Sequence, residues 1–409
     1  MPTADAGSPG PLAGIRIVDL STVLAGPYAT MILADLGADV VKVEPPEGDA
    51  TRTWGPPWVG KVDAGTRTAA YFLAVNRNKR SIRLDLKTPE GVDILRRLLG
   101  TADVLVDNLR PGTLARLGFD DATLAAIDPE LIHLAISGYG PDGPAADRPG
   151  YDFVIQAVGG LMSITGDADA DGGHPTKVGV AISDVVTGLF AAIGILAGLL
   201  ARNGGRGQRI DVSLLSSTLA VLVNQAQNAF VGGASPGRRG NAHPNIVPYE
   251  TFATRDGELA LAVGSERQWV RLCAALGLDE LAADPRFATN GDRVERREEL
   301  RPILAERFAS DTTAIWVARL EAADIPCGAI ADIAAAFDSP EAAARGMRTE
   351  IRHPALGSLA QVGIPIEFAA TPGTIRRPPP LLGEDTDEIL GEIGLAPAEV
   401  ADLRARGVV

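Results

Sequence analysis

The sequence predicts an α/β fold, in which strands alternate with helices and assemble into a sheet. Three observations predict it: a strand–helix–strand opening, a second unit of the same kind, and a further apolar strand before a Gly/Pro-rich loop. The expected elements are residues 15–20, 27–36 and 40–44, then 81–86, 89–99 and 104–107, and then 131–137. Apolar runs of strand length between helical patterns are typical of such sheets.

The later elements follow from local signals. Thr88 is a favoured helix cap and Pro89 suits a first helical turn, so a helix is expected to begin at 89. An apolar helix is expected over 185–201, a strand over 209–213 and a mainly helical segment over 214–230. Short strands at 250–254 and 258–263 precede further helices, which indicates a separate smaller α+β domain. A chain of 409 residues also exceeds what one core usually supports.

Composition excludes several classes of function. The net charge of −14 argues against binding to nucleic acid or to an anionic membrane. Cys273 and Cys327 give neither a disulfide framework nor a metal spacing, and the histidines show no ligand spacing, so no metal site is expected. Residues 1–10 read as a flexible tail without signal-peptide features, which together with the cysteine usage predicts a cytoplasmic protein. The apolar run 185–201 falls short of the roughly 20 residues that span a bilayer.

Asp184 is the candidate catalytic residue, because it stands directly before the apolar helix and follows a Gly-rich loop. The alternative is a helix cap, which aspartate favours. The two roles are compatible, since a helix N-terminus stabilises an anion and would keep the carboxylate ionised and nucleophilic. Tyr151 and Asp152 open the same stretch, either as site residues or as core and turn residues.

Basic residues near the expected strand ends are candidates for binding a phosphate-bearing ligand, because ligands gather at the carboxyl ends of such strands. They are Lys87, Arg110 and Arg116, together with Asn108. The opening turn 21–27 has one glycine where a dinucleotide fingerprint has three, so NAD binding is disfavoured, although Glu44 stands where a ribose-binding acid would be. Serine and cysteine hydrolase motifs are also missing from the sequence.

Ten short motifs in order resemble the class III coenzyme A transferases, the superfamily of formyl-CoA transferase and carnitine-CoA transferase. The motifs are residues 12–19, 25–27, 37–44, 78–81, 108–112, 150–152, 184, 239–244, 325–328 and 379–383. The resemblance implies a large Rossmann-like domain built from both chain ends, a small domain, and an intertwined homodimer. The domains are then a tail (1–10), the first part of the large domain (11–230), linker and small domain (231–330), and the return to the large domain with a C-terminal helix (331–409).

The resemblance also implies a mechanism. Asp184 would attack an acyl-CoA thioester and pass through an aspartyl anhydride and an aspartyl-CoA thioester, with no metal or redox cofactor and with CoA only as a substrate. Asp152 and Tyr151 would lie near the nucleophile. The CoA contacts implied by the family are Leu24, Ala25, Leu84, Lys87, Asn108, Leu109, Arg110, Arg116, Arg148 and Tyr151.

Differences from individual branches narrow the expected substrate. Leu24 and Pro45 replace a glutamine and an arginine of the formyl-CoA transferases, and Tyr151 replaces the histidine of the racemases. Segments 150–166, 211–217 and 246–249 look closest to the succinyl-CoA:dicarboxylate branch, such as glutarate CoA-transferases. Arg238, Arg239, Gly240 and His243 would then bind the acyl or acceptor group. A 2-methylacyl-CoA racemase or epimerase, a CoA-binding protein without turnover and a nicotinamide-dependent oxidoreductase are the alternatives.

Overall fold

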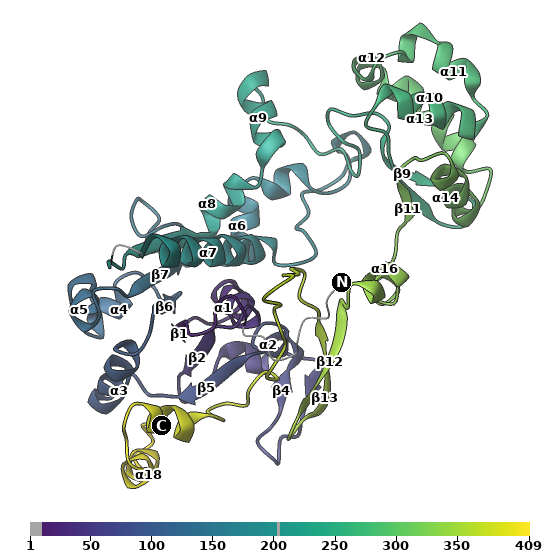
Figure 1. Ribbon diagram of the computed structural model, residues 1–409. Coiled ribbons are helices and arrows are strands. Elements are labelled where there is room, and N and C mark those ends of the chain that lie inside the picture. Colours follow the sequence, from purple (N-terminus) through teal and green to yellow (C-terminus); the bar gives the residue numbers. More distant parts are fainter. Residues whose placement is uncertain (1–9, 203–204) are drawn as a thin grey trace. The chain divides into compact units, whose positions relative to one another are not determined.

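The computed structural model describes residues 10–202 and 205–409 (Figure 1). Residues 1–9, most of the predicted tail, lie outside the described part. The described chain forms two compact units, the large unit (up to 161, 178–227 and 340–409) and the small unit (162–177 and 228–339). The segment 162–177, which the sequence analysis placed in the large domain, therefore belongs to the small unit.

A parallel six-stranded sheet forms the centre of the large unit, in the order β5-β2-β1-β6-β7-β8. Its strands are β1 (Arg16–Asp19), β2 (Asp39–Glu44), β5 (Lys79–Arg83), β6 (Val104–Asp107), β7 (Ile132–Ser137) and β8 (Arg209–Ser213). The central strands are rich in Val, Ile and Leu because helices bury both faces. The order reverses between β1 and β6, which is where ligands bind in doubly wound sheets.

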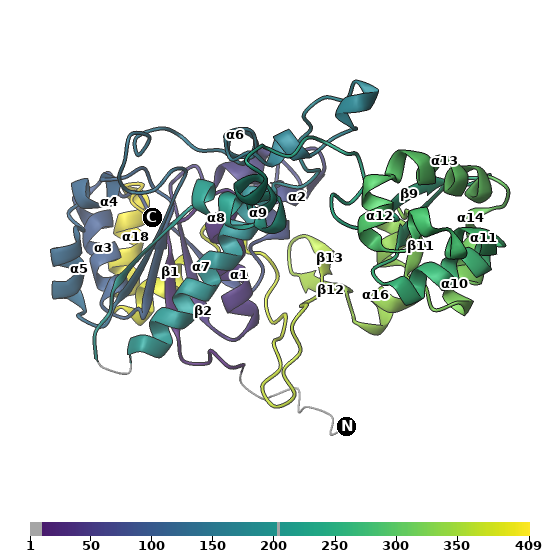
Figure 2. The ribbon, with the colours of Figure 1, turned by 90° about the horizontal axis from the view of Figure 1, so that it is seen from above.

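Helices cover both faces of this sheet, as Figure 2 shows. One face packs against α1 (Ala25–Asp35), α6 (Asp152–Val158), α7 (Ile182–Ala201) and α8 (Leu214–Ala220). The other packs against α3 (Pro89–Leu99), α4 (Thr113–Arg116), α5 (Asp121–Ile127), α17 (Thr386–Glu392) and α18 (Pro397–Ala405). The last two helices bring the C-terminal end of the chain into the same core as α3.

Local signals in the sequence located several elements well. The bounds of α3, β6 and β8 coincide with the prediction, and the Thr88 hydroxyl accepts a hydrogen bond from the Gly91 amide at 3.0 Å. Strand β5 begins and ends earlier than predicted. The mainly helical segment predicted over 214–230 consists of two helices, α8 and α9 (Val223–Gly232), because the chain turns at 221–222.

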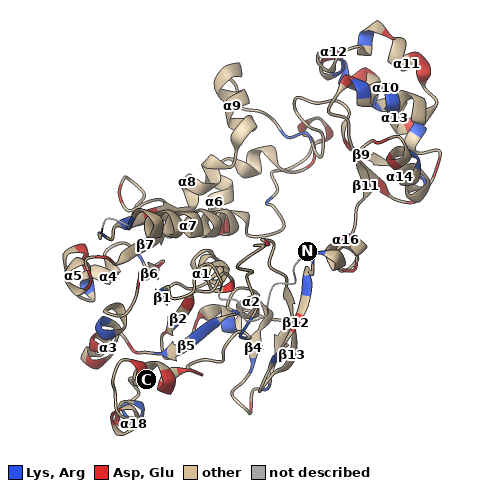
Figure 3. Cartoon of the chain, viewed as in Figure 1, with Lys and Arg blue, Asp and Glu red and all other residues tan. Residues whose placement is uncertain are grey.

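Helix α7 begins at Ile182, with Ala181 as its cap residue, so Asp184 lies in its first turn and not before it. The prediction that Asp184 caps this helix is therefore wrong. The helix has 20 residues and is the one described helix that is long and apolar enough, by length and composition, to cross a membrane. The expectation that this apolar segment is too short to span a bilayer is thus also wrong. The side of α7 that packs against α1, β7 and β8 belongs to the core of the large unit. Figure 3 shows how little charge the helix carries.

Smaller elements complete the large unit. The 3₁₀ helix η1 (Ala50–Thr53), strands β3 (Trp58–Val59) and β4 (Thr68–Ala69) and helix α2 (Ala70–Ala74) follow β2. The hairpin β12 (Arg348–His353) and β13 (Gly357–Val362) contributes Leu359 to a small core with Phe72 of α2. Helix α16 (Pro340–Ala344) precedes the hairpin. The 3₁₀ turns η2 (Leu161–Ile164) and η3 (Asp169–Asp171) follow α6, but η3 and all of η2 except Leu161 belong to the small unit.

The small unit is an α+β structure with its own core. A three-stranded antiparallel sheet has the order β11-β10-β9, from Cys327–Ala329, Glu258–Ala262 and Tyr249–Ala253. Its helices are α10 (Glu266–Leu276), α11 (Asp279–Ala283), α12 (Asn290–Glu295), α13 (Arg297–Phe308), α14 (Thr313–Ala322) and α15 (Ile333–Phe337), with η5 (Pro285–Phe287). Trp269, Leu272, Cys273 and Leu276 recur at helical spacing on the buried face of α10.

Candidate active site

Asp184 projects from the first turn of α7 into a cavity of the large unit. No described residue donates a hydrogen bond to its carboxylate. Burial, with the nearby charge of Asp152 as the second cause, raises the pKa of Asp184 to about 7. At pH 7 the carboxylate is therefore ionised only in part, whereas the sequence led us to expect that the helix N-terminus would keep it ionised at neutral pH.

Asp152 takes the capping role that the sequence analysis gave to Asp184. Its Oδ1 accepts a hydrogen bond from the Ser183 amide at 2.8 Å, and its Oδ2 accepts one from Gln156 Nε2 at 2.8 Å. Gln156 Oε1 in turn accepts from the Val178 amide at 2.9 Å. Asp152 therefore ties the start of α6 to the start of α7, and Asp184 is left without a structural partner.

Tyr71 is a site residue that the sequence reasoning missed. It lies on α2, and its ring meets the Trp54 ring edge-on, with the two centroids 5.4 Å apart. Burial, followed by the charges of Asp184 and Asp152, raises the pKa of Tyr71 to about 12. Its hydroxyl is therefore protonated at neutral pH. The segment 68–72 carries no motif, so only the folded chain shows that this phenol lies near both carboxylates.

The cavity that contains Asp184 has a volume of about 220 Å³ and lies at the reversal of strand order. Six of the predicted CoA contacts line it together with Asp184: Ala25, Asn108, Leu109, Arg110, Arg148 and Tyr151. Thr22, Val23 and the chain at 149–150 also line the cavity. Residues far apart in the sequence thus meet beside one carboxylate.

The other predicted CoA contacts lie outside this wall. Leu84 is 1% exposed in the hydrophobic core, and Leu24 is the cap residue of α1, with no side-chain capping hydrogen bond. Lys87 is exposed in the turn before α3. Arg116 donates a hydrogen bond to the Thr113 hydroxyl at 2.8 Å. Their part in ligand binding stays a prediction.

Two cations that line the cavity have no acidic partner. Within the described chain, neither Arg110 nor Arg148 forms an ion pair, and the same holds for Lys87, which lies outside the cavity wall. Unpaired guanidinium and ammonium groups are suited to the phosphates of a nucleotide-bearing ligand. They are notable in a chain with a net charge of −14.

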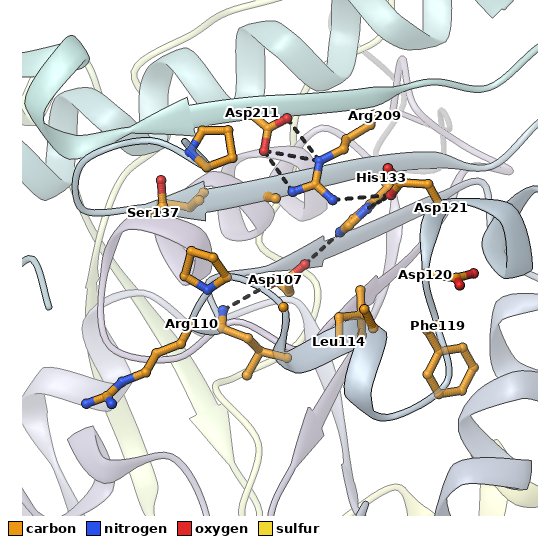
Figure 4. Close-up of a pocket in the computed structure, with 17 residues that line it drawn as sticks. Asp107, Arg110, Leu114, Phe119, Asp120, Asp121, His133, Ser137, Arg209 and Asp211 are labelled. Carbon is orange, nitrogen blue, oxygen red and sulfur yellow. Dashed lines mark hydrogen bonds and ion pairs between the residues drawn. The ribbon is translucent and has the colours of Figure 1, made fainter. Parts of the chain in front are cut away.

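A second cavity, of about 160 Å³, shares the wall formed by Leu109, Arg110 and Pro111 (Figure 4). There, His133 Nε2 lies 2.7 Å from Asp107 Oδ2, and Asp107 Oδ1 accepts a hydrogen bond from the Leu109 amide at 3.0 Å. The Arg209 guanidinium bridges Asp211 and Asp121. The buried His133–Asp107 pair therefore fixes the backbone of the loop that also lines the Asp184 cavity.

The predicted acyl- or acceptor-binding residues lie in the small unit. The Arg238 guanidinium pairs with Asp169 and donates to the Gly173 carbonyl at 3.0 Å, so it is already engaged. Arg239 and Gly240 are exposed, and Arg239 has no acidic partner among the described residues. His243 Nδ1 accepts a hydrogen bond from the Asn245 amide at 3.1 Å, which leaves Nε2 as the protonated nitrogen. Burial, followed by the charge of Arg297, lowers the pKa of His243.

Two other sequence expectations concern structural residues. Glu44, the candidate ribose-binding acid, is 1% exposed, and both its oxygens accept hydrogen bonds from Arg52, at 2.8 and 2.7 Å. Gly159 allows α6 to approach α8, because a Cβ there would lie 3.0 Å from Thr218. Within residues 10–202 and 205–409, no group of three or more His, Cys, Asp or Glu side chains is placed to hold a metal ion.

The fold and the site together define an α/β enzyme in which a partly buried carboxylate lines a ligand cavity, together with two arginines, at the point where the strand order of the sheet reverses. The chain belongs to CoA-transferase family III, whose model matches residues 12–386. This confirms the family inferred from the ten motifs and the prediction of a class III CoA-transferase.

Relatives with named activities match nearly the whole chain. The succinate–glutarate CoA-transferase of Agrobacterium fabrum is 45% identical over 385 residues, which cover 94% of this chain and 96% of that protein. The human succinyl-CoA:glutarate CoA-transferase is 42% identical over 394 residues, covering 96% and 88%. The crystal structure of a CAIB/BAIF family protein from Brucella suis superposes with a TM-score of 0.83 at 43% identity and covers 94% of this chain and 100% of that one.

Proposed function

We propose that this enzyme transfers CoA from succinyl-CoA to a dicarboxylate such as glutarate, with Asp184 as the covalent nucleophile. The observation that carries the proposal is the Asp184 carboxylate, which has no hydrogen-bond donor in the described chain and lines the cavity beside Arg110 and Arg148. The relatives named for succinyl-CoA and glutarate, at 42–45% identity, support the choice of substrates.

In the proposed reaction, an Asp184 carboxylate oxygen attacks the thioester carbonyl of succinyl-CoA and expels the CoA thiolate. The product is a mixed anhydride between Asp184 and succinate. The thiolate then attacks the aspartyl carbonyl, which releases succinate and leaves Asp184 as its CoA thioester. The acceptor carboxylate attacks this thioester, and the thiolate released in that step attacks the acceptor's acyl carbon, which frees Asp184 and forms the new acyl-CoA.

Each step exchanges one acyl–oxygen or acyl–sulfur bond for another, so the reaction requires no electron acceptor and no metal. We therefore propose that prolonged treatment with EDTA leaves the transfer rate unchanged. Arg110, Arg148 and Asn108 bind the CoA moiety in this proposal, and Tyr151 lies at the mouth of the cavity with 63% of its surface exposed.

The test is to quench the enzyme with hydroxylamine during reaction with succinyl-CoA and to analyse its peptides by mass spectrometry. A hydroxamate at Asp184 is expected, because hydroxylamine cleaves both the anhydride and the thioester at the aspartyl carbonyl. Asp184→Ala is the matched control: it should lose transfer and trapping while it still binds CoA in a calorimetric titration. Retained transfer by Asp184→Ala would contradict the mechanism. Transfer to monocarboxylates but never to glutarate would contradict the proposed acceptor.

We further propose that two copies of the chain associate through the apolar surface of α7 and its neighbours. Ile193, Leu196 and Leu200 of α7 are 59%, 37% and 73% exposed, which is unusual for so apolar a helix in water. Light scattering of the purified protein should give twice the mass of the 42.5 kDa chain. Ile193→Asp should shift the protein toward the monomer, and a monomeric wild-type protein would refute this assembly.

A further inference from the structure

Val23 has a left-handed backbone, with φ of 71°. This conformation is unfavourable for a β-branched residue, whose Cβ substituents crowd the neighbouring carbonyl groups. Val23 lies in the connection from β1 to α1 and lines the cavity that contains Asp184. Strain of this kind persists only where the surrounding structure enforces it.

Hydrogen bonds on three consecutive residues enforce it here. Asn108 clamps Thr22 on both sides: its Oδ1 accepts from the Thr22 amide at 2.9 Å and its Nδ2 donates to the Thr22 carbonyl at 2.7 Å. The Val23 amide donates to Asp49 Oδ2 at 3.3 Å. The Ser21 carbonyl accepts from Lys42 Nζ at 2.8 Å.

Lys42 and Asp49, which hold the two ends of this connection, also hold each other. Lys42 Nζ lies 3.0 Å from Asp49 Oδ2, and both side chains are 0% exposed. Asp49 Oδ1 is fixed from its other side by the Thr51 amide at 2.9 Å and the Thr51 hydroxyl at 2.7 Å. Burial opposes both charges, but the partner charges outweigh it, so the pKa of Asp49 is lowered and that of Lys42 is raised. The pair is therefore ionised at neutral pH.

We propose that the buried Lys42–Asp49 pair is a positioning device for the transfer reaction. It holds Val23 in the left-handed conformation and thereby fixes the wall formed by Thr22, Val23 and Ala25 next to Asp184. The inference rests on the proposed function, because it takes the Asp184 cavity to be the place where the acyl group reacts.

The geometry gives the reason for such a device. Two residues after Val23 the chain enters α1 at Ala25, so a change of φ at Val23 rotates the wall relative to α7, which carries Asp184. A displacement of about 1 Å at a reacting centre lowers the rate by up to about a hundredfold. Lys42 and Asp49 are not exposed to the cavity themselves, so they act through the Ser21–Val23 backbone and not by contact with the ligand.

The test is to measure Asp49→Asn in three backgrounds: wild type, Val23→Gly and Val23→Ala. Glycine adopts this φ without a Cβ, whereas alanine shortens the side chain but keeps the Cβ, so alanine is the matched control. In single-turnover acylation of Asp184, we expect Asp49→Asn to lower the rate about tenfold or more in the wild-type and Val23→Ala backgrounds. In the Val23→Gly background the same substitution should lower it about twofold or less.

Three further measurements separate positioning from loss of fold and from failure of the proposed function. The stoichiometry of CoA binding should stay at the wild-type value in every variant, since a merely destabilising substitution would lower it. If Asp49→Asn does not fold, Asn108→Ala, which removes the clamp on Thr22, should show the same dependence on residue 23. Equal losses in all three backgrounds would overturn the positioning role. Absence of a hydroxamate at Asp184 in the wild-type enzyme would instead overturn the proposed function.

Discussion

Replacing Asp184 by asparagine should stabilise the protein, and by more at pH 8 than at pH 5. The pKa of Asp184 is about 7 in the folded chain, against an ordinary value of 3.8. Between these two values the folded state binds more protons at this site than the unfolded state, so the stability of the wild-type protein falls as the pH rises. Asp184→Asn removes this titration and keeps the size of the side chain.

The size of the effect follows from the two pKa values. Their difference corresponds to a limit of about 4 kcal/mol, which is reached above pH 7. At pH 5 the folded group is still protonated while the unfolded group is mostly ionised, which already accounts for about 1.7 kcal/mol. The stabilisation by Asp184→Asn should therefore be larger at pH 8 than at pH 5 by about 2–3 kcal/mol.

The measurement is the free energy of unfolding from urea titrations of both proteins at pH 5 and pH 8, followed by circular dichroism. Comparison at each pH cancels the titration of all other groups, as long as they are independent of Asp184. Asp63→Asn, at an exposed turn, is the control and should show no such difference. If Asp184→Asn stabilised the protein equally at both pH values, or destabilised it at pH 8, the reasoning about the buried carboxylate would be wrong.

Four other predictions concern the same enzyme. The value of kcat/KM for succinyl-CoA should rise with pH through about 7, because in the proposed mechanism only ionised Asp184 attacks the thioester; a flat profile between pH 5 and 8 would contradict this. Asp152→Asn should shift that rise to lower pH, because it removes one carboxylate charge near Asp184. The double variant Asp152→Asn with Gln156→Glu should shift the rise back, because it restores a charge and the hydrogen bond between the two side chains. His133→Leu should destabilise the protein by about 1–3 kcal/mol, because it leaves the buried Oδ2 of Asp107 without its hydrogen-bond partner. It should also raise KM for acyl-CoA more than it lowers kcat, whereas His133→Gln should retain part of both the stability and the affinity. Arg239→Ala should raise KM for glutarate but not for butyrate, and equal effects on both acids would refute a contact with the distal carboxylate.

The sequence predicted those features that depend on local patterns. Strand β6 is short, apolar and bounded by polar residues, and α3 carries its own cap at Thr88, so both were located to the residue. Their positions at a helix start and at strand ends made Asp184, Asn108 and Arg110 candidates, the motif resemblance gave them roles, and the fold brings all three to one cavity. In each case the residues next to the element, or the motif shared with the family, were enough to predict its position or its role.

What the sequence did not predict depends on contacts between distant segments. A helix cap was the alternative role for Asp184, because aspartate favours that position, but the carboxylate of Asp152, which is far from it in sequence, accepts the hydrogen bond from the Ser183 amide at the start of α7 instead. The raised pKa of Asp184 has the same origin, since burial comes from the packing of several segments around it. Tyr71 and the left-handed Val23 have no sequence signal at all, because a lone tyrosine and a valine in a turn predict nothing.

The burial that destabilises ionised Asp184 also bears on the chemistry. An unpaired carboxylate with a pKa of about 7 is a stronger base, and hence a better nucleophile once ionised, than one with an ordinary pKa. In the proposed mechanism, acylation converts it into a neutral anhydride or thioester, so the unfavourable charge disappears from the site as the covalent bond forms. Up to about 4 kcal/mol of the free energy that opposes ionisation is then released in the intermediate. Asp152 sustains this effect by holding its own charge beside Asp184, while both its oxygens are occupied by Ser183 and Gln156 and cannot compete for the acyl group.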